Sequence, residues 1–133
     1  MAQQIFVNLP VKQLSPAVDF FTKLGFSFDP QFTDDNATCM MVGENIFVML
    51  LVNEFFQTFT AKPIVDARHS TEVLVCLALA SRQEVDDLVA KAQAAGGKIP
   101  NPAKDYGFMY SHGFEDLDGH IWELVYMEPK QDE

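Results

Sequence analysis

The order in which strand-like and helix-like segments follow one another occurs twice in this chain. A segment rich in β-branched and aromatic residues at 5–9 precedes an amphipathic helix pattern, and a second such segment at 72–80 precedes another. Each helix pattern has apolar residues at i, i+3, i+4 and i+7, and the first members, Ala17 and Val85, are 68 positions apart. The same shift carries Phe6 onto Leu74. Because residue identities are scarcely repeated, an internal duplication of a βαβββ unit is a hypothesis that rests on the matching periodicities.

Capping and turn signals mark the limits of these elements. Ser15 is the expected N-cap of the first helix with Pro16 at the first helical position, and Ser81 and Glu84 have the spacing of a capping box at the second. A glycine ends each pattern. The remaining strands are expected at 26–28, 37–42 and 46–52 in the first half and at 98–99, 107–114 and 120–127 in the second, with a helical turn and loop at 53–68 and a tight turn at 116–119.

Length and composition fit one folded domain. A chain of 133 residues with 48% hydrophobic and 21% charged residues favours a globular protein over a disordered one. We expect an α+β fold over 1–133, with module one at about 4–52, a linker at 53–70 and module two at about 71–127.

Charge and hydropathy narrow the expected partners and location. Nine Lys and Arg against nineteen Asp and Glu give a net charge of −10, and no segment gathers basic residues, so nucleic acid and anionic membrane are excluded as partners. The longest apolar runs, 46–52 and 73–80, are shorter than the roughly 20 residues of a membrane span, and residues 1–4 lack a cationic leader. We therefore expect a cytoplasmic protein in which Cys39 and Cys76 are reduced thiols.

Two short motifs, one near each end of the chain, are specific enough to compare with known families. The first is VKQL at 11–14, and the second is FEDLDGHIWE at 114–123. Together with the duplicated order they resemble the vicinal oxygen chelate superfamily, which includes glyoxalase I, extradiol dioxygenases, and the fosfomycin and bleomycin resistance proteins. The phrases FVNLPV at 6–11, IFVMLL at 46–51 and GFMY at 107–110 are similar to a bacterial branch labelled predicted lactoylglutathione lyase-related.

The resemblance covers about residues 5–127 and carries expectations about fold and assembly. It implies two βαβββ modules of the glyoxalase/bleomycin resistance/dioxygenase fold, with a cupped mixed sheet and helices on its outer face. It also implies a small-molecule site in the cup and, commonly, a homodimer.

The resemblance also implies where a metal would be held. Metal-dependent members use four inward-facing residues, one from the first strand and one from the last strand of each module. These positions fall on Phe6, Val48, Leu74 and Glu123, and only Glu123 can bind a metal. One carboxylate cannot supply the several oxygen or nitrogen donors that a catalytic ion needs. We therefore expect no metal site and no cofactor.

A register slip of two residues keeps the same strand face inward and offers a different ligand set. It would place Asn8 at the first position and Glu72 or Cys76 at another, beside Glu123. Because Asn is a weak ligand and no His contributes, this set only partly restores a site, and one divalent ion remains the alternative.

Strand alternation within the resembled fold predicts which residues line the cup. Glu123 is the candidate catalytic group, since a carboxylate buried without a cation can act as a general base or a proton donor. That Glu123 is merely paired and buried as a relic of the fold is the open alternative. Replacing Glu123 by Gln is expected to change ligand binding or turnover. The expected ligand-binding residues are Asn8, Met40, Met49, Cys76, Tyr110 and Glu123.

Several other motifs are better explained by structure than by chemistry. His120 and Glu123 are three apart, which puts them on opposite faces of a strand and excludes them as a ligand pair. The segment 116–119 begins like a calcium-binding loop, but its twelfth position is Met127, so a turn is expected. Cys76 has no His in its own segment to activate it, which favours a structural thiol.

Two functions of different classes remain. The first is a metal-independent module that binds a small, partly apolar molecule in the cup, as resistance proteins of the superfamily do by sequestration. The second is an enzyme, a metal-dependent lyase or dioxygenase of the glyoxalase I type. The hydrocarbon side chains at three of the four expected ligand positions favour the first.

Overall fold

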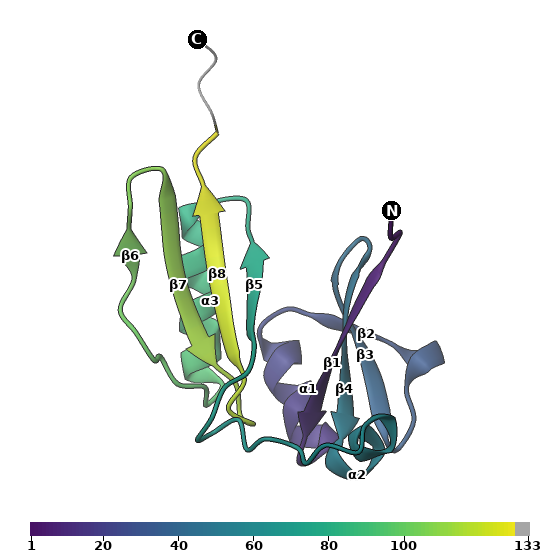
Figure 1. Cartoon of the computed structure of the whole chain (residues 1–133). Helices are drawn as coiled ribbons and strands as arrows, with labels where there is room; N and C mark the ends of the chain where they lie inside the picture. Colours follow the sequence, from purple (N-terminus) through teal and green to yellow (C-terminus); the bar gives the residue numbers. More distant parts are fainter. Residues whose placement is uncertain (130–133) are drawn as a thin grey trace. The chain divides into compact units, whose positions relative to one another are not determined.

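The computed structural model describes residues 1–129, and the chain divides into two compact units. The first unit is Met1–Asp66, and the second begins at Ala67. Each unit contains one four-stranded mixed sheet with a helix on one of its faces (Figure 1). The α+β class and the repeated βαβββ order are confirmed.

The first sheet has the strand order β1-β4-β3-β2, in which β1 and β4 run parallel and the other neighbours antiparallel. The expected helical turn after the last strand is present as α2 and a 3₁₀ turn. The elements of this unit are β1 (Ile5–Val11), α1 (Leu14–Lys23), β2 (Ser27–Asp29), a 3₁₀ turn (Pro30–Phe32), β3 (Ala37–Gly43), β4 (Ile46–Val52), α2 (Asn53–Phe56) and a second 3₁₀ turn (Gln57–Phe59).

The helix α1 presents its apolar stripe, which starts at Ala17, to the core of the first unit. The N-cap expected at Ser15 is wrong. The helix begins at Leu14, and Gln13 takes the extended cap conformation without a side-chain cap bond. Pro16 misled the prediction because its missing N–H is tolerated anywhere in the first turn, so it does not mark the first helical position.

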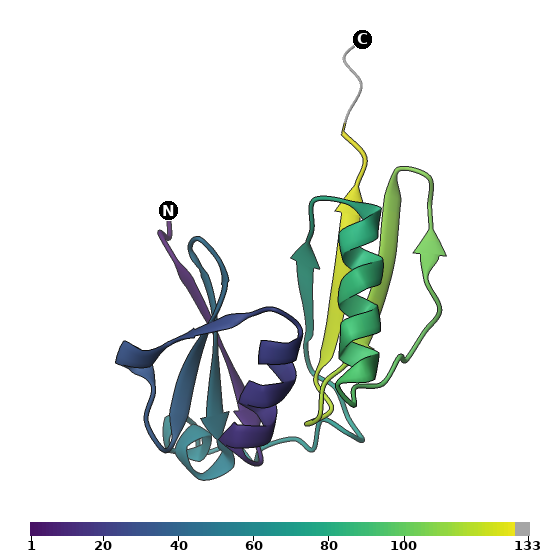
Figure 2. The same ribbon diagram turned by 180° about the vertical axis from the view of Figure 1, so that it is seen from behind.

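The second sheet repeats this topology with the order β5-β8-β7-β6. Again the first pair is parallel and the others are antiparallel. Figure 2 shows α3 lying along one face of this sheet. The elements of this unit are β5 (Leu74–Ala78), α3 (Arg82–Ala94), β6 (Lys104–Asp105), β7 (Met109–Glu115) and β8 (Ile121–Met127).

One strand of the second unit lies elsewhere than the sequence suggested. The expected strand at 98–99 is only an isolated bridge between Lys98 and Glu115, and β6 begins at Lys104, after five intervening residues. Pro100 and Pro102 lie between the two pairings. Because proline has no N–H to donate, it interrupts a ladder, and the segment between the two pairings leaves the sheet.

The capping box of α3 is confirmed. The Ser81 hydroxyl oxygen accepts a hydrogen bond from the Glu84 backbone N–H at 3.1 Å, and the Glu84 carboxylate accepts one from the Ala80 N–H at 2.9 Å. The helix buries Val85 and Val89 against the sheet. Among residues 1–129, no helix is both long and apolar enough to cross a membrane.

A buried carboxylate closes the turn between β7 and β8. Asp116 Oδ1 accepts hydrogen bonds from the N–H groups of Asp118 and His120 at 2.9 and 3.0 Å. Its Oδ2 accepts one from Trp122 Nε1 at 3.0 Å. Burial raises the pKa of Asp116, and the neighbouring His120 and these three donors oppose that rise. The segment is therefore the turn that was expected.

Candidate functional site

Each sheet has an open face, which we define as the face opposite its own helix. In the first sheet Asn8 of β1 pairs with Met49 of β4, and in the second Cys76 of β5 pairs with Glu123 of β8. Their neighbours along the strands are more buried and point to the helix side. Asn8 and Met49 are thus brought together on one open face, and Cys76 and Glu123 on the other.

The ladders extend each pair into a row of residues across the sheet. In the first sheet the row continues through β3 to β2, whereas in the second it stops at β7 because β6 is too short to reach it. We call these the first row, formed by Asn8, Met49, Cys39 and Asp29, and the second row, formed by Cys76, Glu123 and Gly113.

The register corrects one of the four positions at which a metal ligand was expected. Val48 pairs with Val7 and is 1% exposed, so it faces α1, away from the face that carries Phe6. The true counterpart of Glu123 in the first sheet is Met49. The alignment of the two last strands was one residue out, and such a slip turns every side chain to the other face.

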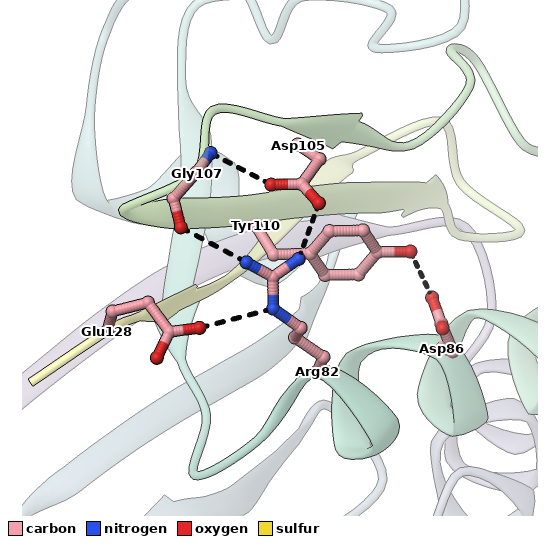
Figure 3. Close-up of polar contacts among 6 residues, drawn as sticks. All are labelled: Arg82, Asp86, Asp105, Gly107, Tyr110 and Glu128. Carbon is pink, nitrogen blue, oxygen red and sulfur yellow. Dashed lines mark hydrogen bonds and ion pairs between the residues drawn. The ribbon is translucent and has the colours of Figure 1, made fainter.

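Two predicted cup residues also lie on the helix side. Met40 pairs with Val48 and is 0% exposed, which places it in the core under α1. Tyr110 pairs with Tyr126, one position out of phase with Glu123, and its hydroxyl donates a hydrogen bond to Asp86 of α3 at 2.5 Å (Figure 3). Periodicity alone did not fix which residues of β3 and β7 face the helices. The expectation that Met40 and Tyr110 lie in the cup is therefore wrong.

The contact of Tyr110 with α3 belongs to a cluster centred on Arg82 (Figure 3). The guanidinium group lies 5.2 Å from the centre of the Tyr110 ring and pairs with Asp105 at 2.7 Å and Glu128 at 3.3 Å. It also donates a hydrogen bond to the Gly107 carbonyl at 3.2 Å. Arg82 thereby fastens β6 and the residues that follow it to the helix.

The cluster shifts two pKa values in opposite directions. The hydrogen bond from Arg82 is the main cause that lowers the pKa of Asp105, and the Gly107 N–H adds to it. The hydrogen bond to Asp86 is the main cause that raises the pKa of Tyr110. Both groups therefore keep their usual charge at neutral pH.

A pocket of about 160 Å³ opens beside the second row. Its floor comes from β7 and β8 and its wall from the segment that leaves the sheet between Lys98 and β6. Most lining residues carry polar groups. They are Pro100, Asn101, Pro102, Lys104, Tyr106, Ser111, His112, Gly113 and Glu123.

Gly113 has no side chain and so leaves the space of this pocket open. A Cβ at this position would lie 2.6 Å from the Trp122 carbonyl oxygen and 3.4 Å from Glu123 Oε2. Any side chain here would therefore push against the backbone of β8 and crowd the carboxylate. The counterpart in the first row, Cys39, fills the same position with a side chain that is 1% exposed.

The charged groups of the pocket are not neutralised by the protein. Among residues 1–129, the structure gives neither the Glu123 carboxylate nor the Lys104 ammonium a hydrogen-bond or ion-pair partner. Glu123 is half-buried, and Lys104 is exposed. Both charges are therefore available to a bound molecule.

Cys76 lies beside Glu123 but is not an activated nucleophile. Burial is the larger cause that raises the pKa of the Cys76 thiol, and the negative charge of Glu123 raises it further. A thiol with a raised pKa stays protonated at neutral pH, and the thiolate is the reactive form. Cys76 therefore acts in the second row as a small, weakly polar side chain.

The donor set does not fit the divalent ion that the superfamily implies. Phe6 and Leu74 lie on the open faces as hydrocarbon, Val48 faces the core, and Glu72 precedes β5 outside the ladder. In the part of the chain that the structure describes, no three His, Cys, Asp or Glu side chains gather closely enough to hold a metal ion. Glu123 and the protonated Cys76 do not make a coordination site.

The repeated βαβββ unit defines a fold class. Comparison with known families agrees with it. The model of the Glyoxalase/Bleomycin resistance protein/Dioxygenase superfamily matches residues 3–124, so the chain belongs to that superfamily. A comparison with curated proteins gave no match.

Solved structures agree with this fold. The hypothetical protein SA1046 from S. aureus is 29% identical over 95% of both chains, with a TM-score of 0.80. A glyoxalase/bleomycin resistance protein/dioxygenase family enzyme from Burkholderia phytofirmans PsJN is 15% identical over 92% of this chain and 96% of its own, with a TM-score of 0.77. A glyoxalase-related enzyme from Fulvimarina pelagi is 21% identical over 94% and 88%, also with a TM-score of 0.77.

Sequence reasoning missed most of the pocket. Lys104, Tyr106 and Ser111 were not singled out, because nothing in their spacing shows that they converge. The two prolines at 100 and 102 were the one available signal, since they predict a break in strand pairing. Gly113 could not be recognised without the register that places it opposite Glu123.

Proposed function

We propose that this protein binds a small, partly apolar molecule on the open face of its second sheet, without the divalent metal used by metal-dependent members of its superfamily. One observation carries the proposal. Of the four positions at which the superfamily holds an ion, only Glu123 has an oxygen or nitrogen donor, and Phe6, Met49 (the counterpart of Glu123 in place of Val48) and Leu74 have none. A site with this composition favours binding over metal-assisted chemistry.

The surroundings of Glu123 support a ligand that is part apolar and part polar. Ile121 and Val125 flank it on the same strand face, and Leu74 of β5 is 52% exposed on that face. Apolar walls with a few placed polar groups are usual for small-molecule sites. In this proposal Glu123 anchors a polar group of the ligand, and Cys76 lies against its apolar part. Asn8 and Met49 form a separate candidate contact surface on the open face of the first sheet.

Metal analysis of the purified full chain tests the metal-independent part. We expect zinc, nickel, iron and manganese well below one ion per chain. A tightly held ion at one per chain, lost in the Glu123→Gln variant and retained in Glu115→Gln, would overturn the proposal. Glu115 is a matched control because it lies on the open face of β7 outside the pocket.

A screen of small fragments by amide NMR tests the binding part. Fragments with an apolar body and one polar group are expected to shift the amides of Cys76, Gly113 and Glu123. The Glu123→Gln variant should weaken these shifts, whereas Glu115→Gln should leave them. If no fragment moves the second row, the site is not a binding site.

The second candidate function is a metal-dependent lyase or dioxygenase of the glyoxalase I type. The pairing of Cys76 with Glu123 favours it, because a thiol and a carboxylate side by side could supply two donors. It needs a third donor that the described residues do not group with these two. The metal analysis above decides between the two functions.

We also propose that the protein acts as a cytoplasmic homodimer, as the superfamily resemblance implies. Light scattering during gel filtration should give about twice the chain mass of 14.9 kDa. A mass equal to one chain at micromolar concentration contradicts the dimer.

A further inference from the structure

We propose that the pocket beside Glu123 receives a zwitterionic head group, with an ammonium on the Glu123 carboxylate and a carboxylate on the Lys104 ammonium. This inference rests on the proposed function and names the class of ligand that the site takes. The ligand would resemble an α-amino acid in its polar head and extend an apolar body over the open face.

The pocket is a gap in the edge of the second sheet. Glu115 exchanges two backbone hydrogen bonds with Lys98, of 3.0 and 2.7 Å, and the next pairing on that side joins Ser111 to Lys104. Between these pairings the segment 99–103 makes no backbone hydrogen bond with β7 among the described residues. The gap therefore lies at Gly113, midway between Ser111 and Glu115.

Among the described residues, the gap leaves the backbone N–H and C=O of Gly113 without a hydrogen-bond partner. In an antiparallel ladder, alternate residues direct both N–H and C=O to the same neighbour. Glu115 exchanges backbone hydrogen bonds with Lys98, and the Met109 carbonyl accepts one from the Tyr106 N–H at 2.8 Å. Gly113 is in phase with Met109 and Glu115, so its backbone N–H and C=O also point to this side and face the gap. An N–H that faces a cavity lined by a lysine is suited to a carboxylate oxygen.

The two charges select a ligand that carries both signs. Lys104 and Glu123 line the same pocket but do not pair with each other. A simple cation at Glu123 would meet the repulsion of Lys104, and a simple anion at Lys104 would meet that of Glu123. A molecule with an ammonium and a carboxylate a few bonds apart satisfies both groups, and the hydroxyls of Ser111 and Tyr106 can complete its hydrogen bonds.

The size of the pocket and the way its wall is held are consistent with a small head group. Its volume of about 160 Å³ is below the roughly 300–1,000 Å³ of sites for drug-sized molecules. Lys104 belongs to β6, whose next residue, Asp105, is fixed by Arg82 (Figure 3). Arg82 is thus a positioning residue that places the Lys104 side of the pocket.

Binding of three related probes to the full chain tests the inference. The probes are L-leucine, leucinamide, which lacks the carboxylate, and N-acetyl-leucine, which lacks the ammonium. Dissociation constants come from amide NMR titrations at pH 7. We expect L-leucine to bind about tenfold more tightly than either analogue, because each lost charged hydrogen bond is worth about 1.4 kcal/mol or more.

Two variants separate the two ends of the head group. Glu123→Gln should remove the preference of the protein for L-leucine over N-acetyl-leucine, and Lys104→Met should remove its preference over leucinamide. The matched controls are Glu115→Gln and Lys98→Met, which change the same residue types on the same sheet outside the pocket. Both controls should keep both preferences.

The outcomes distinguish this inference from the proposed function. Equal affinity for the three probes, or variants that weaken all three alike, would overturn the zwitterion assignment. If L-leucine does not bind but other fragments still shift the second row, the head-group inference fails and the proposed function stands. If nothing in the fragment screen shifts the second row, both fail.

Discussion

The first and second rows occupy the same positions in two sheets of the same topology, yet they differ in chemistry. In the first row β2 reaches the ladder, so Cys39 is followed by Asp29 and the row is complete. In the second sheet β6 pairs further along β7 and does not reach the second row. Gly113 occupies the position equivalent to Cys39, and Glu123 occupies the position equivalent to Met49. The result is a buried Cys39 side chain in the first row and a polar pocket beside the second.

This difference shows how a repeated fold can differ locally between its two copies. The parallel pair, the hairpin and the helix are common to both units and fix where each row lies. Three local changes in the second unit then make the pocket: two prolines that break the edge, a glycine that lowers the floor, and a carboxylate above it. Each change can be reversed, so the comparison can be tested residue by residue.

The largest expected effect comes from making the second row resemble the first with Gly113→Cys. Because the new Cβ would lie 2.6 Å from the Trp122 carbonyl oxygen, β8 must shift, and we expect a loss of about 3 kcal/mol in the free energy of unfolding. Urea denaturation measures it. The matched control is Gly43→Ala, where the nearest atom is the flexible end of Ile46 at 3.1 Å and the loss should be smaller. Equal losses would show that Gly113 is not a special position.

The next effect compares the hairpin turns of the two units. Asp116→Asn places an NH₂ group where Oδ2 accepts from Trp122 Nε1, and leaves a buried donor without a partner. We expect a loss of about 2 kcal/mol in the free energy of unfolding, measured by denaturation at pH 7.

The control for that turn is Glu44→Gln, in the exposed turn between β3 and β4. It should change the free energy of unfolding by less than about 0.5 kcal/mol. The pKa of Asp116 is raised in the folded chain, so folding favours its protonated form. Ionisation of Asp116 at neutral pH therefore lowers the free energy of unfolding. This loss becomes smaller as the pH falls through the raised pKa toward the ordinary value of 3.8. A flat difference between wild type and Asp116→Asn from pH 7 to pH 4 would contradict this direction.

A smaller effect concerns the thiols of the two rows. Glu123→Gln removes a negative charge beside Cys76, so the pKa of the thiol should fall and its alkylation by iodoacetamide at pH 7.5 should become about twofold faster or more. The rate is measured in a Cys39→Ser background. In the first row, Asp29→Asn also removes a charge that raises a thiol pKa, but burial of Cys39 should keep its alkylation slow. No change in the Cys76 rate would mean that Glu123 does not act on it.

The smallest expected effect is a local change in hydrogen exchange caused by Arg82→Gln. It should speed hydrogen exchange of the amides at 105–107 and leave that of β2 in the first unit unchanged, because β2 is held by its own ladder. The pKa of Asp105 is lowered in the folded chain, so the ion pair contributes above the ordinary pKa of 3.8 and is lost as the pH falls through the lowered value. That acid-dependent part should be absent in the variant. Equal exchange rates would show that Arg82 does not hold β6.

Much of the fold could be predicted because its elements depend on local pattern. The stripes of α1 and α3, the limits of β4 and the cap at Ser81 are as the periodicity and capping rules indicate. The errors at Ser15 and at 98–99 arose where proline chemistry allows more than one position.

The candidate site was only partly predictable. The pairs Asn8 with Met49 and Cys76 with Glu123 lie on open faces as strand alternation suggests, whereas Met40, Val48 and Tyr110 face the helices. Alternation gives two classes of residue within a strand but does not say how neighbouring strands are aligned, and a shift of one residue exchanges the classes.

By itself the sequence determined the repeated βαβββ order and the superfamily, since these depend on residue type and on spacing along one chain. Only the tertiary structure decided that Glu123, Gly113 and Lys104 share a pocket and that, within residues 1–129, the charges of Glu123 and Lys104 stay unpaired. These residues come from different strands, and their convergence depends on the register of long-range backbone hydrogen bonds, which no local pattern in the chain encodes.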